Sequence, residues 1–288
     1  MRHAPAHLAA DSVNMTLYSE LWGRVSVLCP RCQLAALPRA RRALLVLLSL
    51  AATAAWAGPP YITDDPDIPP PGGWEINVPF ILERTTETDM EAPLFDINYG
   101  MPAMYGLPHV QLKLEIPVEV VRKADGGTEA GPGDMLLGVK WPFLEEQGWR
   151  PVIGIYPQLL VPTGDASRGL GEGRPAYALP ALAEKHWGKW TVYGDVGYVV
   201  QTAVAQPNYW YEGLSINREI SKRLELGAEI AYNSPPPTEG YSNLAFNLGG
   251  TWKMSEHLNL LFSAGRSIQG ETRFMAYLGI QFELGGTQ

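Results

Sequence analysis

The residues with the most varied chemistry are charged side chains that recur at every second position of several extended-looking runs. In the run His109–Arg122, Lys113, Glu115 and Glu119 share one parity, while the opposite parity is apolar. Carboxylates and ammonium groups on one face can pair with each other or line a polar path for a solute. The charged candidates on the polar faces of all predicted runs are Glu75, Asp96, Glu115, Glu119, Asp134, Asp195, Glu225, Glu229, Lys113, Lys140, Arg223, Lys253 and Arg273.

Two interpretations of this charged set stand side by side. Opposite charges could pair across strands and fill an interior as a structural network, because buried charge is tolerated only when it is paired. Alternatively, the set lines an open pore, whose excess of acids predicts a preference for cations or neutral solutes over anions. Gln111 is a further candidate on these faces. Tyrosines on the same faces, together with Leu136, Leu160 and Met275, would either pack the interior or give an amphipathic path for small aromatic solutes: Tyr156, Tyr193, Tyr211 and Tyr277.

No catalytic, cofactor-binding or metal-binding site is predicted. His109, His186 and His257 fall at turns between the extended runs described below, on different hairpins and all at the end that is predicted to face the periplasm. An outer-membrane phospholipase needs its serine and histidine near the outer leaflet, so these positions disfavour that chemistry. Carboxylates in the outer loops leave carboxylate-only hydrolysis as a third hypothesis. The glycine loop 169–173 is followed by neither a helical pattern nor a lysine, which argues against phosphate binding.

The clearest structural element is the run His109–Arg122. Val110, Leu112, Leu114, Ile116, Val118 and Val120 occupy one parity of this run, opposite its charged residues. An extended chain with this pattern has one apolar and one polar face. Its length exceeds the usual globular strand of about five or six residues and suits a tilted strand that crosses a bilayer, which needs about nine to eleven.

The pattern recurs through the rest of the chain and predicts an all-β fold. The predicted strands are Trp74–Arg84, Pro93–Met101, His109–Arg122, Gly133–Glu145, Pro151–Thr163, Arg174–His186, Trp190–Thr202, Tyr209–Ser221, Arg223–Asn233, Asn243–Met254, Leu258–Ser267 and Thr272–Leu284. Twelve strands of this kind predict a transmembrane antiparallel up-and-down β-barrel.

The connections support this topology. Alternate ones, such as TTETDMEA, KADGGTEAGP and TGDASRGLGEG, are mostly long, whereas the others, such as EQGWR, WGK and SEH, are mostly short. Outer-membrane barrels have short periplasmic turns and longer outer loops. The connection 102–108 is longer than this rule predicts. A soluble β-sandwich is the alternative, but in such a fold long and short loops need not alternate along the chain.

Aromatic residues gather near the predicted strand ends, where interfacial girdles lie in membrane barrels. They are Trp74, Trp141, Trp187, Trp190, Trp210 and Trp252. The net charge of −8 and the lack of a basic block argue against nucleic acid as a partner.

The first 57 residues are predicted to be a leader. Residues 36–57 combine a basic stretch, an apolar core of about thirteen residues and Ala55-Trp56-Ala57, which together indicate a signal peptide cleaved before Gly58. Residues 1–35 lack any such pattern, so translation is expected to start nearer Val25 to Leu37. Cys29 and Cys32 lie in this leader, and the rest of the chain has no cysteine.

The predicted barrel, residues 74–288, follows an acidic, proline-rich tail at residues 58–73. Prolines remove backbone donors and fix φ, so regular structure is not expected in the tail. It is either a periplasmic linker or a plug folded into the barrel lumen.

Several blocks of the sequence resemble a known family. They are ITDDP at 62–66, DINYG at 96–100, QLKLEIP at 111–117, GPGDMLLGVKWPF at 131–143, VPTGD at 161–165, GLGEG at 169–173 and LPALAEKHWGKWTVYGDVGY at 179–198. Together they are similar to the outer-membrane transporter family named for the meta-cleavage pathway of phenol degradation. The resemblance covers nearly the whole mature chain and implies a barrel that passes small compounds, including aromatic ones.

The predicted function is that of a passive, porin-like channel in the outer membrane of a Gram-negative envelope, without a cofactor. Its expected partners are outer-membrane lipid, a small-molecule solute and the barrel-assembly machinery that inserts it. The alternative is a closed structural barrel without transport activity.

Overall fold

The computed structural model describes residues 59–85, 88–104, 107–123, 126–202, 207–234 and 243–286. All of them belong to one compact unit, Leu50–Gln288. The predicted leader, both cysteines and the expected cleavage site lie outside the described residues. Over the described ranges, no helix is both long enough and apolar enough to cross a membrane.

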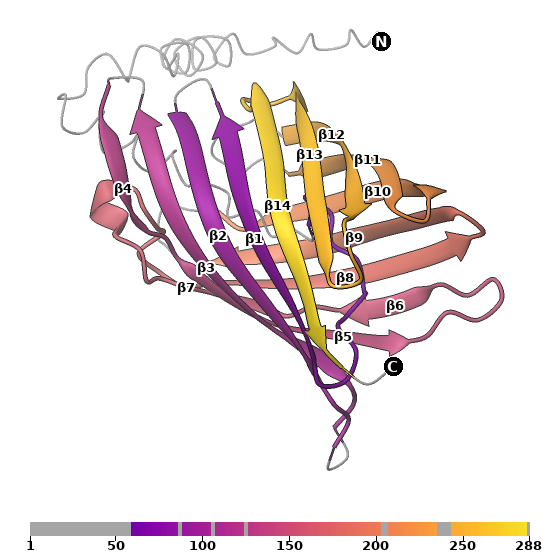
Figure 1. The fold of residues 1–288 in the computed structure, drawn as a ribbon. Coiled ribbons are helices and arrows are strands. Elements are labelled where there is room, and N and C mark those ends of the chain that lie inside the picture. Colours follow the sequence, from indigo (N-terminus) through magenta and orange to yellow (C-terminus); the bar gives the residue numbers. More distant parts are fainter. Residues whose placement is uncertain are drawn as a thin grey trace, which may run out of the picture. The chain divides into compact units, whose positions relative to one another are not determined.

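The fold is a closed antiparallel β-barrel (Figure 1). Its strands are β1 (Gly73–Arg84), β2 (Thr88–Met101), β3 (Val110–Lys123), β4 (Thr128–Pro132), β5 (Met135–Leu144), β6 (Val152–Ile155), β7 (Gln158–Val161), β8 (Ala176–Trp187), β9 (Trp190–Gln201), β10 (Tyr209–Ser221), β11 (Leu224–Asn233), β12 (Asn243–Lys253), β13 (Leu258–Gln269) and β14 (Phe274–Gly285). Pairing of β1 with β14 closes the ring.

Fourteen strand segments form a barrel of twelve strands because two strands are interrupted. β4 and β5 both pair with β3, and the break between them falls at Gly133 and Asp134. β6 and β7 both pair with β5 and β8, and the break falls at Tyr156 and Pro157. The predicted all-β barrel is therefore confirmed.

Alternating burial along the strands agrees with the alternation in the sequence. In β3, Gln111 and Lys113 are buried, whereas Leu112 and Val118 are 40% exposed. This burial pattern is the reverse of that in a soluble protein, in which apolar side chains are the buried ones. The polar parity of β3 therefore faces the lumen and the apolar parity faces outward.

Two connections differ from the sequence prediction. The stretch TTETDMEA is predicted to be a long loop, but β2 already begins at Thr88, and the Thr85 backbone N–H donates to the Thr88 carbonyl at 2.8 Å. The stretch KADGGTEAGP is also predicted to be a loop, but β4 extends the wall into its second half. Turn-forming residue types favour a loop in both stretches, whereas cross-strand pairing keeps these residues extended.

The end of the barrel with the connections 162–175 and 234–243 is called the outer end here, and the end with the turns 188–189 and 222–223 is called the periplasmic end. These names follow the loop-length rule for outer-membrane barrels. The loop 162–175 contains the one short helix of the described residues, η1 (Ala166–Arg168), capped by Asp165.

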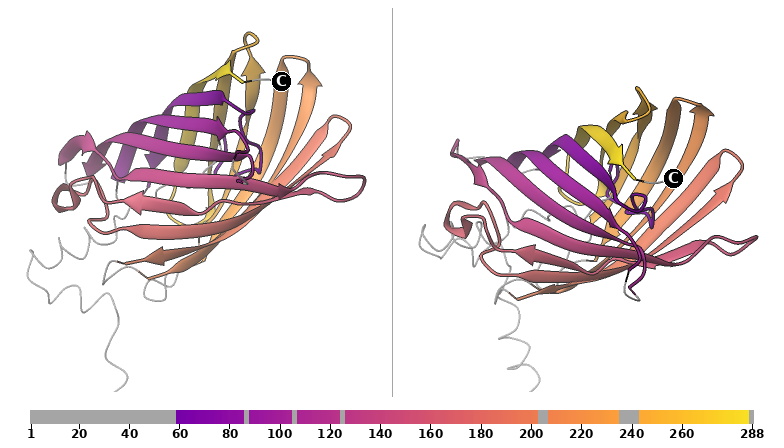
Figure 2. Two further views of the ribbon diagram at one scale, coloured as in Figure 1. Left: turned by 90° about the horizontal axis from the view of Figure 1, so that it is seen from below. Right: turned by 60° about the horizontal axis from the view of Figure 1, so that its bottom comes forward.

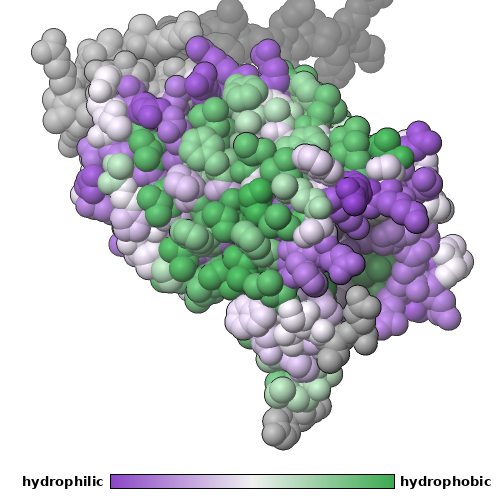
Figure 3. Space-filling view, viewed as in Figure 1, coloured by the Kyte–Doolittle hydropathy of each residue, from purple (hydrophilic) through white to green (hydrophobic). Residues whose placement is uncertain are grey.

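The outer surface of the barrel is strongly apolar (Figure 3). Exposed positions include Phe80, Phe95, Leu179, Leu214 and Leu248, all between 46% and 60% exposed. Soluble monomers rarely expose contiguous apolar surface on this scale, whereas a lipid-facing barrel wall requires it. The predicted girdle tryptophans are exposed as well: Trp74, Trp141, Trp187, Trp190, Trp210 and Trp252.

The tail preceding β1 turns inward and runs within the ring of strands (Figure 2). Of the two placements that the sequence leaves open, the described residues 59–72 adopt the plug.

Candidate functional site

The tail enters the lumen at the periplasmic end through backbone contacts. The Gly72 backbone N–H donates to the Gly100 carbonyl at 2.7 Å, and the Gly73 N–H donates to the Pro70 carbonyl at 2.8 Å. The ring Nε2 of His109 lies 3.0 Å from the Pro69 carbonyl. A Cβ at Gly100 would lie 2.3 Å from the Pro70 carbonyl oxygen, so only glycine leaves room for the tail there.

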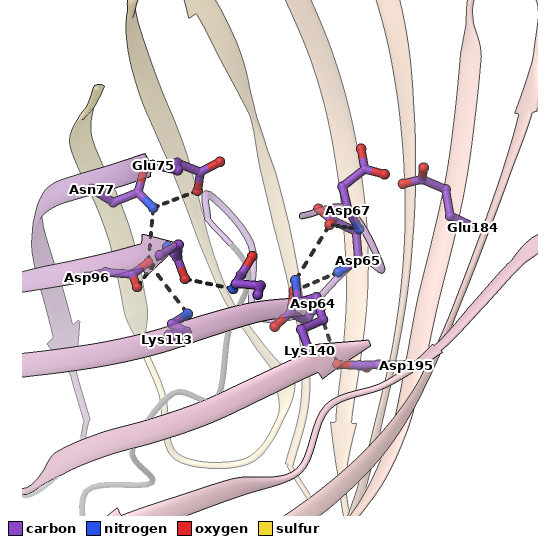
Figure 4. A network of polar contacts seen from close by, with 12 residues as sticks. Asp64, Asp65, Asp67, Glu75, Asn77, Asp96, Lys113, Lys140, Glu184 and Asp195 are labelled. Carbon is purple, nitrogen blue, oxygen red and sulfur yellow. Dashed lines mark hydrogen bonds and ion pairs between the residues drawn. The ribbon is translucent and has the colours of Figure 1, made fainter. Parts of the chain in front are cut away.

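Further inside the lumen, charged side chains hold the tail. Lys140 on β5 forms an ion pair with Asp64 at 2.7 Å and lies 3.8 Å from Asp65 (Figure 4). Asp195 on β9 accepts a hydrogen bond from the Asp64 backbone N–H at 3.1 Å. Asp64 and Lys140 are both buried, so this ion pair is largely removed from water.

Glu229 on β11 is the second anchor of the tail. Its two carboxylate oxygens accept the backbone N–H groups of Ile62 at 2.9 Å and Thr63 at 2.7 Å. The amide of Asn247 also donates to it, at 2.5 Å. Hydrogen bonds to a charged acceptor contribute more than neutral ones, about 1.5–3 kcal/mol each.

A separate polar network lines the wall formed by β1, β2 and β3. Lys113 lies 2.6 Å from Glu115 and 3.5 Å from Asp96 (Figure 4). Asn77 donates its amide hydrogens to Asp96 and to Glu75, each at 3.0 Å. This part of the predicted charged set therefore pairs across strands.

Tyr156 connects the two lysine clusters. Its ring is fully buried and lies 5.9 Å from the Lys113 ammonium and 5.2 Å from that of Lys140. A Cβ at Gly138 would lie 2.6 Å from the Tyr156 ring, so the glycine of β5 provides the space for it. Tyr156 occupies the break between β6 and β7, where the backbone leaves the regular ladder.

Above the tail lies a cavity, which we call the vestibule. It encloses about 1050 Å³ of empty space, its open mouth included, and Pro59, Pro60, Tyr61 and Ile62 of the tail form part of its wall. The other lining residues come mostly from the outer halves of the strands and are Ile81, Leu82, Glu83, Leu94, Asp96, Glu115, Tyr209, Tyr211, Asn233, Asn243, Asn247, Ser263, Met275, Ala276 and Tyr277.

The loop 162–175 packs against the barrel wall at the break between β4 and β5. Asp134, at the break between β4 and β5, accepts the backbone N–H groups of Gly164 at 2.8 Å and Glu172 at 2.6 Å. Leu170 is completely buried. The glycine loop 169–173 is therefore tied to a carboxylate, which disfavours an anionic ligand such as phosphate there.

Most of the predicted lumen candidates lie on inward-facing positions. The buried ones are Asp96, Gln111, Lys113, Asp134, Lys140, Tyr156, Tyr193, Asp195, Tyr211 and Glu229, and the half-buried ones are Glu75, Glu115, Glu119, Glu225 and Tyr277.

Three predicted cations do not join these networks. Arg223 lies in the turn before β11, Lys253 ends β12 and Arg273 precedes β14, and all three are exposed. Parity alone gives the face of a strand and not the depth along it, so it groups residues at the rim with residues in the lumen. The deep lumen consequently has fewer cations than predicted.

Sequence reasoning missed the tail acids Asp64 and Asp65, because a proline-rich segment has no periodicity that assigns it a face. It also missed Glu184, which is buried and shares the inward parity of β8. The uncharged polar residues Asn77 and Asn98 could have been found from the parity that they share with Glu75 and Asp96.

His109, His186 and His257 lie at the same end of the barrel, the end with the short turns. His186 contacts Glu146 at 2.9 Å through Nδ1 and Glu184 at 3.4 Å through Nε2. Hydrogen bonds from Lys185 and His186 lower the pKa of Glu146 to about 2. Glu146 lies in the connection between β5 and β6 and ties it to the end of β8.

This contact predicts a pH effect on the β5–β6 connection. Because the pKa of Glu146 is lowered, its stabilising contribution is present above the ordinary carboxyl pKa of about 4.5 and is lost as the pH falls toward 2. At neutral pH, Glu146→Gln should speed hydrogen exchange of amides 145–150, while Glu145→Gln should not. Equal exchange in the two variants would contradict the assignment.

Comparison with solved structures agrees with the barrel. The COG4313 outer membrane channel from Pseudomonas putida F1 matches with a TM-score of 0.62 and 17% identity, over 77% of this chain and 99% of that one. The CymD monoaromatic hydrocarbon channel matches with a TM-score of 0.41 and 8% identity, over 76% and 90%. Outer membrane phospholipase A from Escherichia coli gives 0.43 and 12%, over 83% and 98%. Of these three scores, the first exceeds 0.5, so that match alone bears on the fold.

No curated protein matches the sequence. A family model described as "Putative MetA-pathway of phenol degradation" matches residues 57–284, which include the tail and nearly the whole barrel. This agrees with the family resemblance of the sequence blocks. The chain belongs to this phenol-degradation family of outer-membrane-type β-barrels.

Proposed function

We propose that this protein is a passive outer-membrane channel for small, neutral and predominantly apolar solutes, including aromatic ones. The observation that carries the proposal is the vestibule. Aliphatic and tyrosine side chains such as Leu94, Met275 and Tyr277 line it together with hydrogen-bonding groups such as Asn243 and Asn247. Binding sites for small organic molecules are typically concave, mostly apolar and equipped with a few polar groups.

The chemistry of the vestibule also supports selection by charge. Glu83, Asp96 and Glu115 line it, and no lysine or arginine is among the described residues that do so. Anionic solutes would therefore meet unfavourable charge, whereas neutral solutes would not. The proposal includes no catalytic step and no cofactor.

Location in the outer membrane requires export. In this proposal residues 36–57 act as a signal peptide and are removed before Gly58, and the lipid-facing wall is then inserted by the barrel-assembly machinery. Mass spectrometry of the mature N-terminus tests the cleavage. A mature protein that begins far from Gly58 would contradict this part.

Uptake of labelled phenol by intact cells tests the channel. Cells that express the protein should take up phenol faster than matched cells without it, and benzoate, which has the same ring and a negative charge, should gain less. Leu94→Trp should lower the phenol rate because the larger side chain fills the vestibule. Leu248→Trp is the matched control, since Leu248 is 60% exposed on the outer wall. A closed structural barrel predicts equal rates in all of these cells.

A further inference from the structure

We propose that the segment Tyr61–Asp65 is a releasable plug that occupies a socket built for it in the barrel wall. Its release would open the periplasmic half of the lumen. The plug rests on the proposed function and deepens it by adding a closed state to the channel. It can be tested with ions alone, independently of which solute the vestibule accepts.

The socket is made by four different strands. Lys140 of β5 pairs with Asp64, Asp195 of β9 accepts the Asp64 backbone N–H, and Glu229 of β11 accepts two further backbone N–H groups. Gly213 of β10 supplies the fourth part, because a Cβ there would lie 2.1 Å from the Thr63 hydroxyl oxygen. Side chains placed on separate strands thus converge on one short segment, which indicates specific recognition.

The two ends of the tail are held differently. Residues 69–73 contact the rim largely through backbone groups. The segment Tyr61–Asp65 is held by side chains, which can exchange these contacts for water. Release of Tyr61–Asp65 therefore does not require the rim contacts of residues 69–73 to break.

The electrostatic balance of the socket favours a plug that can leave. When seated, the tail places Asp64 next to Asp195 and Thr63 next to Glu229, and within the described residues Lys140 is the cation that pairs with Asp64 and Asp65. In Figure 4 the carboxylates of Asp67 and Glu184 also face each other. Buried ion pairs bring little net stabilisation because desolvation offsets their attraction.

Incomplete hydrogen bonding in the socket also favours a plug that can leave. Within the described part of the chain, the Thr63 hydroxyl, one carboxylate oxygen of Asp64 and one of Asp195 are buried without a hydrogen-bond partner. A buried unsatisfied polar atom costs about 1–3 kcal/mol. Release of the tail would return these atoms to water.

A reversible cross-link tests the plug in the complete mature protein. Both natural cysteines lie in the leader, so the double variant Thr63→Cys, Gly213→Cys would carry one pair. The Thr63 Cβ lies 2.9 Å from the position of a Cβ at 213. A disulfide needs about 3.5–4.5 Å between Cβ atoms, so a small shift of the tail suffices.

Potassium conductance in planar bilayers is the measurement. The oxidised double variant should stay in a low-conductance state, and reduction should restore openings. Gly213→Cys alone, which cannot cross-link, should not respond to the reductant. Equal conductance of the oxidised and reduced forms, with the disulfide verified by mass, would overturn the proposal, as would failure of the disulfide to form.

A second pair of variants keeps the proposal falsifiable if the cross-link disturbs folding. Glu229→Gln replaces one of the two acceptor oxygens by an amide donor and should raise the open fraction about tenfold, the equivalent of one charge-assisted hydrogen bond. Glu219→Gln makes the same change at an exposed residue of β10 and should have no effect. Equal open fractions would show that Glu229 does not hold the plug. If the conductance changes as expected but phenol is not taken up, the result would support the releasable plug and contradict the proposed solute class.

Discussion

Deletion of residues 59–70 should raise the single-channel conductance of the barrel several-fold. These residues occupy the lumen from the periplasmic rim to the vestibule, and Asp64 is buried against Lys140. A barrel of twelve strands is wider than the eight-stranded barrels whose interior side chains fill completely, so removal of the tail should leave a water-filled path. Planar bilayer recordings in potassium chloride provide the measurement.

The barrel wall should still fold when residues 59–70 are deleted. β1 begins at Gly73 and pairs with β2 and β14, and neither pairing uses the deleted residues. Heat modifiability on gels, which reports a folded barrel, should therefore be unchanged and serves as the control. A folded deletion variant with the conductance of the complete chain would show that the tail is not what restricts the lumen.

Replacement of Lys113 should have the largest effect on stability. Lys113→Met removes the cation that lies between Asp96 and Glu115 and leaves the two carboxylates close together in the wall. Loss of one partner of a buried ion pair typically costs about 3–5 kcal/mol. The free energy of unfolding in lipid vesicles, measured by denaturant titration, should fall by about this amount.

Two comparisons separate this effect from a general loss of charge. Lys253→Met makes the same change at an exposed residue and should alter the free energy of unfolding by no more than about 0.5 kcal/mol. Adding Asp96→Asn to Lys113→Met should recover part of the loss, because it removes one of the unpaired charges. Equal losses in the two single variants would mean that water screens the Lys113 cluster.

The strands could be predicted from the sequence because successive residues of a membrane-barrel strand alternate between the lipid-facing side and the lumen-facing side. In β3, the apolar residues Leu112 and Val118 face outward and the polar residues Gln111 and Lys113 face the lumen, so one alternating run indicates both fold and face. Charge pairing in the wall follows from the same pattern, because Lys113 and Asp96 lie on paired strands and on the same face.

The tail could not be placed in this way. Asp64 bonds to Asp195 across 131 positions of the sequence, and nothing local to a proline-rich segment specifies such a partner. The sequence also could not show how deep in the lumen a residue lies, because polar and apolar residues alternate in the same way at the rim and at the centre. For this reason the sequence pattern does not separate Arg223 and Arg273 from Lys140.

The direction in which the tail runs has a consequence for handling the protein. Pro59 lies in the wall of the vestibule, above the periplasmic rim at which the tail enters. A purification tag or fluorescent domain fused directly before Pro59 would therefore begin inside the lumen and would have to thread outward or pull the plug from its socket. Gly286, near the other terminus, lies beside Pro70 at the periplasmic rim and is exposed. Labels for purification, surface attachment or microscopy belong at the C-terminus.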